Sequence, residues 1–259
     1  MSTPLLQVKN LTKSFGGVTA VSGVDFHIDK GEIVAVIGPN GAGKTTLFNL
    51  ITGILPATLG QVFFNNEEIT RKKPFEIAKV GITRTFQNLQ VFENMSVIEN
   101  VMTGVHCRLK TGIFHSGLRL PRVKKEEGKV FDIAMEWLTK VGIPDLAFED
   151  SKTIPYGNQR LLEIARAAAS NPQLILLDEP MAGLNTEESR ELVEVIREMR
   201  KDGMSFLFVE HDMETVMAIS DRIVVIDYGK KIAEGTPVEI YENEKVIAAY
   251  LGVEEDEEI

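Results

Sequence analysis

The sequence predicts an α/β fold built around a mostly parallel sheet. Three short runs are apolar throughout, as buried central strands are: Ile33–Ile37, Leu174–Leu177 and Phe206–Val209. Residues 187–200 follow a helical pattern between the last two runs, and strands that alternate with helices form parallel sheets. The 259 residues, 44% hydrophobic and 25% charged, suffice to bury a full core, as one large domain or as a domain with a subdomain.

The chain is expected to open with an antiparallel β subdomain. Leu5–Val8 and Val18–Ile28 alternate imperfectly between apolar and polar residues, and Gly16–Gly17 marks a turn between them. Phe15 precedes that turn, where it is either a core aromatic residue or an exposed ring that stacks on a base. Gln61–Phe64 is expected to form a further short strand.

The middle of the chain favours helices after a strand-like stretch at Ile82–Gln87. Ser96 and Glu99 form a capping box that begins a helix. Apolar residues then recur at helical spacing and predict one buried face of a second helix: Val130, Phe131, Ala134, Met135, Leu138 and Val141.

The last third of the chain shows three further signals. A helix is expected over Ile154–Ser170, with an apolar face of Leu161, Leu162, Ile164, Ala165 and Ala168. A hairpin is expected near Tyr228–Gly229. Thr236, Pro237 and Glu239 combine a cap, a proline at the first helical position and an acid at the third, and so begin the last helix.

Residues 106–129 differ in composition from the rest of the chain. They hold two acidic residues, Glu126 and Glu127, and seven basic ones: Arg108, Lys110, Arg119, Arg122, Lys124, Lys125 and Lys129. Such a run is either a solvated loop or a surface that faces a membrane-embedded partner or acidic headgroups. Cys107 is the one cysteine, which excludes an internal disulfide framework and is interpreted as an incidental small side chain.

Composition also excludes some function classes. A formal net charge of −10 argues against a broad nucleic-acid surface, which needs clustered Lys and Arg. The start MSTPLLQVKN lacks the basic segment and apolar run of a signal peptide. No apolar run approaches the roughly 20 residues that a membrane-spanning helix needs. We therefore expect any membrane role to come through a partner.

The first buried strand leads into a phosphate-binding loop. GPNGAGKT matches G-x-x-x-x-G-K-[ST] at every fixed position, between a strand and a helix. Glycines let successive N–H groups converge on an anion, Lys44 reaches the β- and γ-phosphates, and the Thr45 hydroxyl can ligate Mg²⁺. The sequence thus predicts a P-loop NTPase core whose nucleotide-binding residues are Gly38, Pro39, Asn40, Gly41, Ala42, Gly43, Lys44, Thr45 and Thr46.

Polar residues also follow the other two buried strands. Asp178 and Glu179 come after one, and Glu210 and His211 after the other, so all three strands would deliver functional groups to one sheet edge. Asp178 is placed to hold Mg²⁺ through its water shell, and Glu179 to orient and deprotonate the attacking water. Taken singly, an acid pair is often a helix cap and a single histidine a satisfied polar residue.

The order of these elements resembles the ATP-binding subunit of ABC transporters over nearly the whole chain. The matching pieces are the phosphate loop, RTFQ ending at Gln87, LILLDE, and EHD with its histidine. The resemblance implies that His211 hydrogen-bonds the γ-phosphate and that Gln87 touches Mg²⁺ or the attacking water. It also implies that Phe15 stacks on adenine, where the family usually has tyrosine.

Two motifs depart from the family pattern. Where the family has Leu-Ser-Gly-Gly-Gln, a segment that acts on the ATP of the opposite subunit, this chain has Ile154 followed by Pro155, Tyr156, Gly157 and Asn158. Pro155 removes the serine hydroxyl, while Gly157 and the helix N-terminus keep backbone N–H donors. The family's Ser-Ala-Leu-Asp turn at the dimer contact becomes Ala-Gly-Leu followed by Asn185.

The resemblance implies a head-to-tail dimer, of two identical chains or with a sister ATPase. Residues 1–87 and 171–235 would form the nucleotide-binding core, 88–170 a helical subdomain that grips a membrane permease subunit, and 236–259 a C-terminal helix and acidic tail. The expected place is the cytoplasmic face of the membrane. RTFQ, PYGNQR, the insertion at 103–128 and AYLG look most like the ATPases of branched-chain amino-acid importers, where a solute-binding protein joins the assembly without touching this subunit.

Other functions stay open at this point. The chain could serve an ABC exporter for another substrate, or act as a soluble ABC ATPase in DNA repair or translation. The second class usually carries a coiled-coil insertion or two cassettes in one chain, neither of which the sequence shows. A protein that binds ATP without hydrolysing it is disfavoured by Glu179, whose expected role is hydrolytic.

Overall fold

The computed structural model describes residues 3–106 and 121–254, without the side chains of 106, 121–126 and 251–254. The strands are β1 (Leu6–Phe15), β2 (Val18–Ile28), β3 (Ile33–Ile37), β4 (Leu59–Phe64), β5 (Glu67–Glu68), β6 (Ile82–Arg84), β7 (Leu174–Asp178), β8 (Ser205–Val209), β9 (Arg222–Asp227) and β10 (Lys230–Gly235). The helices are α1 (Lys44–Ile51), α2 (Pro74–Val80), α3 (Val97–His106), α5 (Pro121–Lys140), α6 (Tyr156–Ala169), α7 (Thr186–Lys201), α8 (Met213–Ile219), α9 (Pro237–Tyr241) and α10 (Glu244–Glu254), with a short 3₁₀ turn at Pro144–Leu146.

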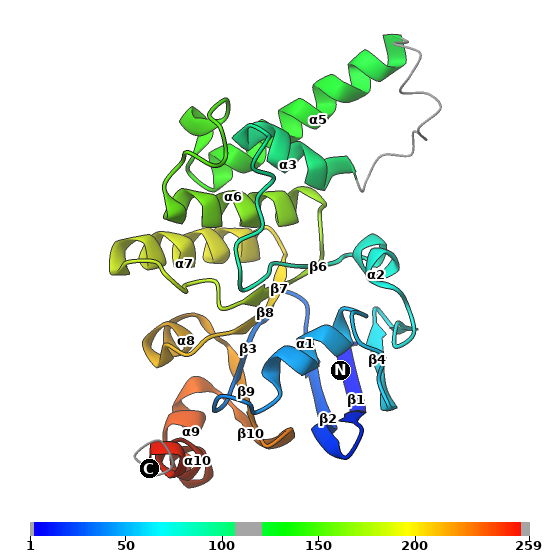
Figure 1. Cartoon of the computed structure of the whole chain (residues 1–259), viewed down its shortest axis with the longest axis vertical. Coiled ribbons are helices and arrows are strands. Elements are labelled where there is room, and N and C mark those ends of the chain that lie inside the picture. The colour runs from blue at the N-terminus through cyan, green and yellow to red at the C-terminus, as the bar shows by residue number, and fades with distance from the viewer. Residues whose placement is uncertain (1–2, 107–120, 255–259) are drawn as a thin grey trace.

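A six-stranded sheet in the order β10-β9-β3-β8-β7-β6 forms the centre of the molecule (Figure 1). Every pair is parallel except β9–β10, the hairpin predicted at Tyr228–Gly229. β3, β7 and β8 are buried at all their residues, as the apolar runs within them predict, and the burial extends to the polar residues Asp178 and Ser205 at their ends. Asp178 pairs with Val209, so the carboxyl ends of β7 and β8 are level. The predicted α/β fold is confirmed.

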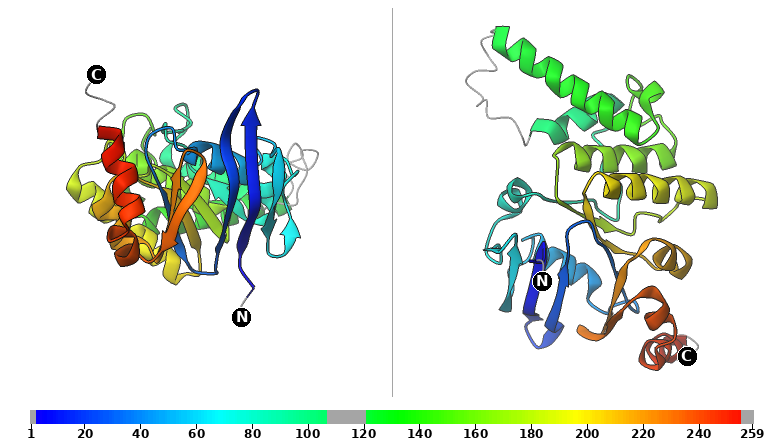
Figure 2. Two further views of the ribbon diagram at one scale, coloured as in Figure 1. Left: turned by 90° about the horizontal axis from the view of Figure 1, so that it is seen from below. Right: turned by 180° about the vertical axis from the view of Figure 1, so that it is seen from behind.

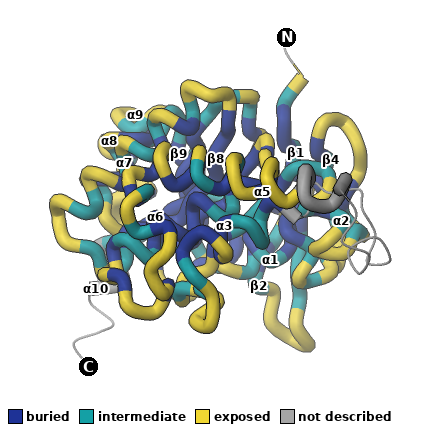
Figure 3. Tube along the Cα trace, turned by 90° about the horizontal axis from the view of Figure 1, so that it is seen from above, coloured by how far each residue is buried: buried dark blue, intermediate teal, exposed yellow. Residues whose placement is uncertain are grey.

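A second, antiparallel sheet in the order β2-β1-β4-β5 confirms the expected opening subdomain (Figure 2). β1 is longer than the sequence pattern suggested, because shifts in register between Val8 and Leu11 absorb the imperfect alternation. Buried residues of this sheet share one core with α1, including Leu6 and Phe48. Buried positions gather along the sheets and the inner faces of helices, while connecting turns are exposed (Figure 3).

Helices α3, α5 and α6 form a separate layer beyond α7 (Figure 1). The capping box is confirmed, since Glu99 Oε2 accepts the Ser96 N–H at 2.8 Å. Val130, Ala134 and Leu138 are buried as predicted. Phe131 is not part of that buried face: it is 37% exposed and stacks on Phe148, with ring centroids 6.4 Å apart.

Two predicted boundaries were wrong. The strand expected over 82–87 ends at Arg84, because the following backbone carbonyls bond to Arg160 of α6 instead of to β7. The last helix is divided: α9 ends at Tyr241, and α10 begins after Asn243, whose side chain accepts the Lys245 N–H. The core of the basic segment, with Cys107, lies outside the described residues.

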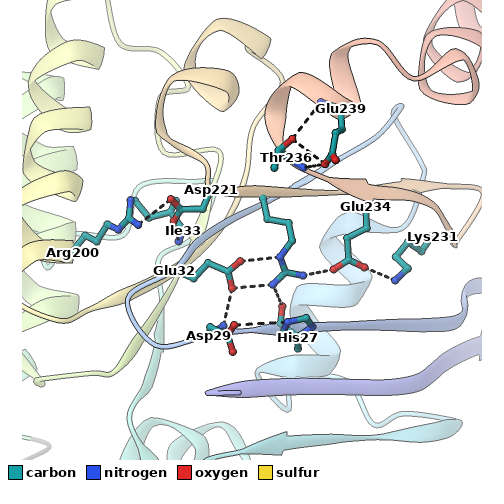
Figure 4. Close-up of polar contacts among 11 residues, drawn as sticks. His27, Asp29, Glu32, Ile33, Arg200, Asp221, Lys231, Glu234, Thr236 and Glu239 are labelled. Atoms are coloured by element: carbon teal, nitrogen blue, oxygen red, sulfur yellow. Dashed lines mark hydrogen bonds and ion pairs between the residues drawn. The ribbon is translucent and has the colours of Figure 1, made fainter. Parts of the chain in front are cut away.

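The amino-terminal edge of the main sheet is joined to its neighbours by one guanidinium. Arg222 of β9 bonds Glu32 before β3 at 2.8 Å and the carbonyl of His27 on β2 at 2.7 Å, and it also pairs with Glu234 of β10 (Figure 4). This cluster lies at the opposite end of the parallel strands from the predicted nucleotide site. Within the described residues, no helix is both long and apolar enough to cross a membrane.

Candidate active site

The phosphate loop joins the buried end of β3 to the start of α1. Gly38 has φ +153°, and a Cβ there would lie 1.9 Å from the carbonyl oxygen of Ile226. Gly43 has φ +102°, and its Cβ would lie 2.3 Å from the oxygen of Ala20. Neither position has room for a side chain, so glycine is required by backbone conformation and by packing. The helix begins at Lys44, and its first backbone N–H groups are available to an anion.

The Lys44 side chain folds back onto the phosphate loop. Its side chain is buried, and Nζ donates to the carbonyls of Gly38 at 2.6 Å and Pro39 at 3.0 Å. Burial lowers the pKa of the ammonium, and the nearby carboxylates of Glu179 and Asp178 oppose that shift. Lys44 therefore lies in a cradle of carbonyl oxygens, near Asp178 at the end of β7 and Glu179 directly after it.

Glu179 adopts a backbone conformation that is rare for its residue type. Its φ is +47°, in the left-handed region, and its N–H donates to the Val209 carbonyl at 3.0 Å. Such a conformation costs of order 1–3 kcal/mol and is typical of functional sites. Glu179 follows the last residue of β7 and is half-buried, whereas Asp178 is buried at the strand end.

Gln87 and His211 both bond to Glu179. Gln87 Nε2 donates to Glu179 Oε2 at 2.8 Å, and His211 Nε2 lies 3.0 Å from Glu179 Oε1. The three residues expected to act in hydrolysis are far apart in the sequence. In the structure the side chains of Gln87 and His211 both contact the carboxylate of Glu179. Because the Gln87 amide donates through its nitrogen, its oxygen is not used in this bond.

The donors near the loop fit magnesium bound together with a nucleotide. The oxygens available are the Asp178 carboxylate, the exposed Thr45 hydroxyl and the Gln87 amide oxygen. Within residues 3–106 and 121–254, no group of three or more His, Cys, Asp or Glu side chains could hold a metal ion. Mg²⁺ in phosphate sites takes one or two protein carboxylates and fills its shell with phosphate and water oxygens. The set therefore suits a magnesium–nucleotide complex and not a metal held by protein alone.

Sequence reasoning missed Arg84, which holds Asp178. Arg84 donates to Asp178 Oδ2 and to Asn49 Oδ1 of α1, both at 2.6 Å, and its guanidinium lies over the rings of Phe48 and Phe86. The ion pair is almost completely buried. No sequence signal could have identified it, since the pair depends on β6 lying beside β7.

Glu210 was expected at this sheet edge, but the sequence assigned it no role of its own. It is 5% exposed; its Oε1 accepts the Met181 N–H at 2.7 Å and its Oε2 accepts the His211 N–H at 3.2 Å. Burial raises the pKa of this carboxyl group, and the backbone hydrogen bonds oppose the shift. Glu210 thereby ties the segment of His211 to the turn that follows Glu179.

The signature segment, Ile154–Asn158, begins α6. Pro155 is the exposed N-cap residue and provides no side-chain cap, while Tyr156 is the first helical residue. Gly157 is buried, and a Cβ there would lie 2.6 Å from Glu188 Oε1. Asn158 is half-buried.

Asn185 and Phe15 have local roles that the structure shows directly. Asn185 Oδ1 accepts the N–H groups of Glu187 at 2.9 Å and Glu188 at 3.0 Å, so it caps α7. Phe15 is 46% exposed at the end of β1, with Lys13 Nζ 4.9 Å from its ring centroid. Of its two interpretations, the core aromatic is wrong.

Two family models match the chain. One, described as ABC transporter, matches residues 21–182, and one described as branched-chain amino acid ATP-binding cassette transporter matches residues 230–256. The chain is 44% identical over 253 residues to the high-affinity branched-chain amino acid transport ATP-binding protein LivG of Escherichia coli, covering 97% of this chain and 99% of that protein. It is 42% identical, with the same coverage, to BraF of Pseudomonas aeruginosa, which carries the same description.

A solved structure agrees with this assignment. The ADP conformation of an ATP-binding cassette of an ABC transporter superposes with a TM-score of 0.85 and 34% sequence identity, covering 97% of this chain and all of that one. The first family model spans more than half of the chain, and the curated relatives align over nearly all of it. The chain therefore belongs to the ABC transporter ATPase family.

Proposed function

We propose that this chain is the ATP-hydrolysing subunit of an ABC importer for branched-chain amino acids. The relatives that align over nearly the whole chain are named as high-affinity branched-chain amino acid transport ATP-binding proteins, and the C-terminal family model is described as a branched-chain amino acid ATP-binding cassette transporter. The observation that carries the hydrolytic part is the convergence of Gln87 and His211 on Glu179, beside the phosphate loop and Lys44.

In this proposal the loop binds the phosphates of ATP. The backbone N–H groups at the start of α1 and the Lys44 ammonium face the β- and γ-phosphates, and Phe15 offers an exposed ring for adenine. Thr45, Asp178 and Gln87 would hold Mg²⁺. When bound, the ion neutralises charge that develops on the phosphate oxygens.

Glu179 orients the attacking water and accepts its proton. Gln87 and His211 hold the two carboxylate oxygens, so the side chain is fixed before substrate arrives. Positioning of this kind suits phosphoryl transfer, where catalysis is mainly orientation and charge stabilisation. When the proposed dimer closes around ATP, the His211 side chain would turn from Glu179 to the γ-phosphate.

The hydrolytic role is tested by Glu179→Gln. The amide keeps the size of the side chain but cannot accept the proton, so we expect turnover to fall at least about 100-fold, as for loss of a general base. Mg-ATP binding should persist and a nucleotide-bound dimer should accumulate, seen by equilibrium binding and light scattering. Hydrolysis at the wild-type rate would remove Glu179 from this role.

The dimer is proposed to place each ATP between one phosphate loop and the signature segment of the opposite subunit. Pro155 contributes no hydroxyl there, so the contact depends on Tyr156, Gly157, Asn158 and the N–H groups of α6. Asn185 lies at the turn that would meet the opposite subunit. Either an identical chain or a sister ATPase fits this arrangement.

A groove between the core and the helical layer is proposed as the seat of a membrane permease, which would keep the chain at the cytoplasmic membrane face. Its volume is about 580 Å³, and it is lined by residues of β6, α2, α3 and α6. The lining includes Ile54, Phe86 and Phe92, which are 44%, 44% and 50% exposed. Exposed apolar side chains around a groove mark an interaction surface. The solute-binding protein of the importer would meet the permease and not this chain.

Phe92→Asp tests that surface. A carboxylate in the apolar groove must be desolvated on docking, so we expect the variant to lose co-purification with the permease while Mg-ATP binding is unchanged. Phe148→Asp is the control, because Phe148 is 75% exposed and is not among the groove residues. If the Phe92 variant still associates with the permease, the permease docks on another face of the chain.

Uptake of radiolabelled leucine by the assembled complex would identify the solute and the direction of transport.

A further inference from the structure

A buried ion pair lies at the start of α6. The guanidinium of Arg160 and the carboxylate of Glu163 are 2.9 Å apart, and the side chains are 1% and 2% exposed. Removing two charges from water costs several kcal/mol per ion, and their attraction recovers this only with further hydrogen bonds. The partners that supply those bonds therefore indicate what the pair does.

The pair holds the backbone of the segment that carries Gln87. Arg160 donates to the carbonyl of Phe86 at 3.2 Å and to that of Gln87 at 3.3 Å, and Glu163 Oε1 accepts the Phe86 N–H at 3.4 Å. The Gln87 side chain in turn donates to Glu179 Oε2. One route thus runs from α6 through residues 86–87 to Glu179.

A second route leads from the same guanidinium through Tyr156. Arg160 donates to the Tyr156 hydroxyl at 3.4 Å, and that hydroxyl donates to the Ala182 carbonyl at 3.3 Å. Ala182 belongs to the turn that follows Glu179, since its N–H donates to the Glu179 carbonyl at 3.1 Å. The phenol ring lies against this turn, because a Cβ on Gly183 would be 3.1 Å from it.

We propose that Tyr156 and Arg160 are positioning residues that couple the signature segment to Glu179 of the same chain. The two routes reach Glu179 from both sides, through its carboxylate and through its backbone turn. A shift of the α6 N-terminus therefore moves both supports of Glu179 together. The family's signature has glycine where this chain has Tyr156, so the hydroxyl link is a feature that the family pattern does not supply.

The inference rests on the proposed role of Glu179 and adds a link between its own site and the signature segment, which would bind the other nucleotide of the dimer. ATP that engages the signature segment would set the geometry of Glu179 in the same subunit. The energy involved is that of one or two hydrogen bonds, so its effect is a modulation of turnover and not its loss.

Tyr156→Phe tests the link, because it removes only the hydroxyl from a side chain that is 44% exposed. We expect kcat to fall about three- to tenfold, the equivalent of one hydrogen bond. KM for ATP and the Kd for Mg-ATP should stay within about twofold, since phenylalanine keeps the ring and the backbone N–H through which residue 156 would meet the ATP of the opposite subunit. Hydrogen–deuterium exchange should quicken at the Ala182 and Leu184 amides, which bond within the turn.

Matched variants separate this inference from the proposed function. Tyr241→Phe, on an exposed ring of α9, should change neither kcat nor exchange. Arg160→Lys keeps the charge but loses the fork of donors, and should lower kcat further than Tyr156→Phe. If Glu179→Gln still hydrolyses ATP at the wild-type rate, the proposed role of Glu179 fails, and the coupling that rests on it fails too. If Glu179→Gln is inactive but Tyr156→Phe has wild-type kcat, or changes only KM, the coupling is overturned and the proposed function stands.

Discussion

The Asp178 carboxylate is held by the guanidinium of Arg84 on the neighbouring strand β6, and this ion pair is the most important single contact in the site. The side chains of Arg84 and Asp178 are 7% and 5% exposed, and Asn49 occupies the other end of the fork. A charge buried this far is costly unless it has a charged or hydrogen-bonding partner. Arg84 supplies that partner from within the protein itself.

Arg84→Met should lower the free energy of unfolding by about 3–5 kcal/mol, because it leaves the Asp178 carboxylate buried without its partner. Chemical denaturation measures the loss. Arg197→Met removes an ion pair whose members are 41% and 64% exposed, and should cost no more than about 1 kcal/mol. If both variants lose the same free energy of unfolding, the buried Arg84–Asp178 pair contributes no more to stability than an exposed pair.

At the scale of elements, the start of α7 is set by the side chain of one residue, Asn185. The resemblance assigns Asn185 to the dimer contact, and the structure shows that it also caps α7 in a capping box with Glu188. The cap fixes where the turn after Glu179 ends and the helix begins. Similar caps begin α3, at Ser96, and α9, at Thr236, and both of these follow from patterns of neighbouring residues.

Asn185→Ala should destabilise the chain by about 1 kcal/mol, since two N–H groups of the first turn lose their acceptor. Asn185→Asp should keep the wild-type stability, because aspartate is an equally good cap and its charge suits the helix dipole. Denaturant midpoints compare the three proteins. A loss in the aspartate variant as large as in the alanine variant would argue against capping.

At the scale of the whole molecule, the Arg222 cluster joins both sheets and the C-terminal hairpin. Arg222 bonds to residues before β3, on β2 and on β10, and Lys231 adds a second cation at Glu234 (Figure 4). Burial opposes ionisation of Glu234, but Lys231 and Arg222 outweigh it and lower its pKa below the ordinary 4.5. The folded protein therefore favours the ionised form more than the unfolded chain does.

Because the pKa of Glu234 is lowered in the folded protein, the free energy of unfolding depends on pH. A carboxyl group with a lowered folded pKa contributes stability above its unfolded value, and that contribution is lost as pH falls through the folded pKa. Glu234→Gln should thus be less stable than wild type at pH 7, with the gap closing below about pH 4.5. Denaturation across pH 3–7 measures it. Glu198→Gln, in an exposed pair with Lys201, should show almost no gap at any pH.

Much of the fold follows from local pattern. Uniformly apolar strands, glycine spacing and capping boxes act over a few residues, so the sequence alone predicts β3, β7, β8, the phosphate loop and the starts of α3 and α9. Two of the predictions that failed depended on partners more distant in sequence. β6 stops where Arg160 replaces β7 as hydrogen-bond partner, and Phe131 packs on Phe148 instead of entering the core.

The order of residues alone decides which groups this protein has for its chemistry: a glycine loop with Lys44, two acids after a buried strand, a glutamine and a histidine. It cannot decide which groups touch, because hydrogen bonds between residues 87, 179 and 211, or between Arg84 and Asp178, exist only once strands distant in sequence lie side by side. Local sequence supplies the reactive side chains, whereas packing between residues far apart in the sequence sets the distances between those side chains.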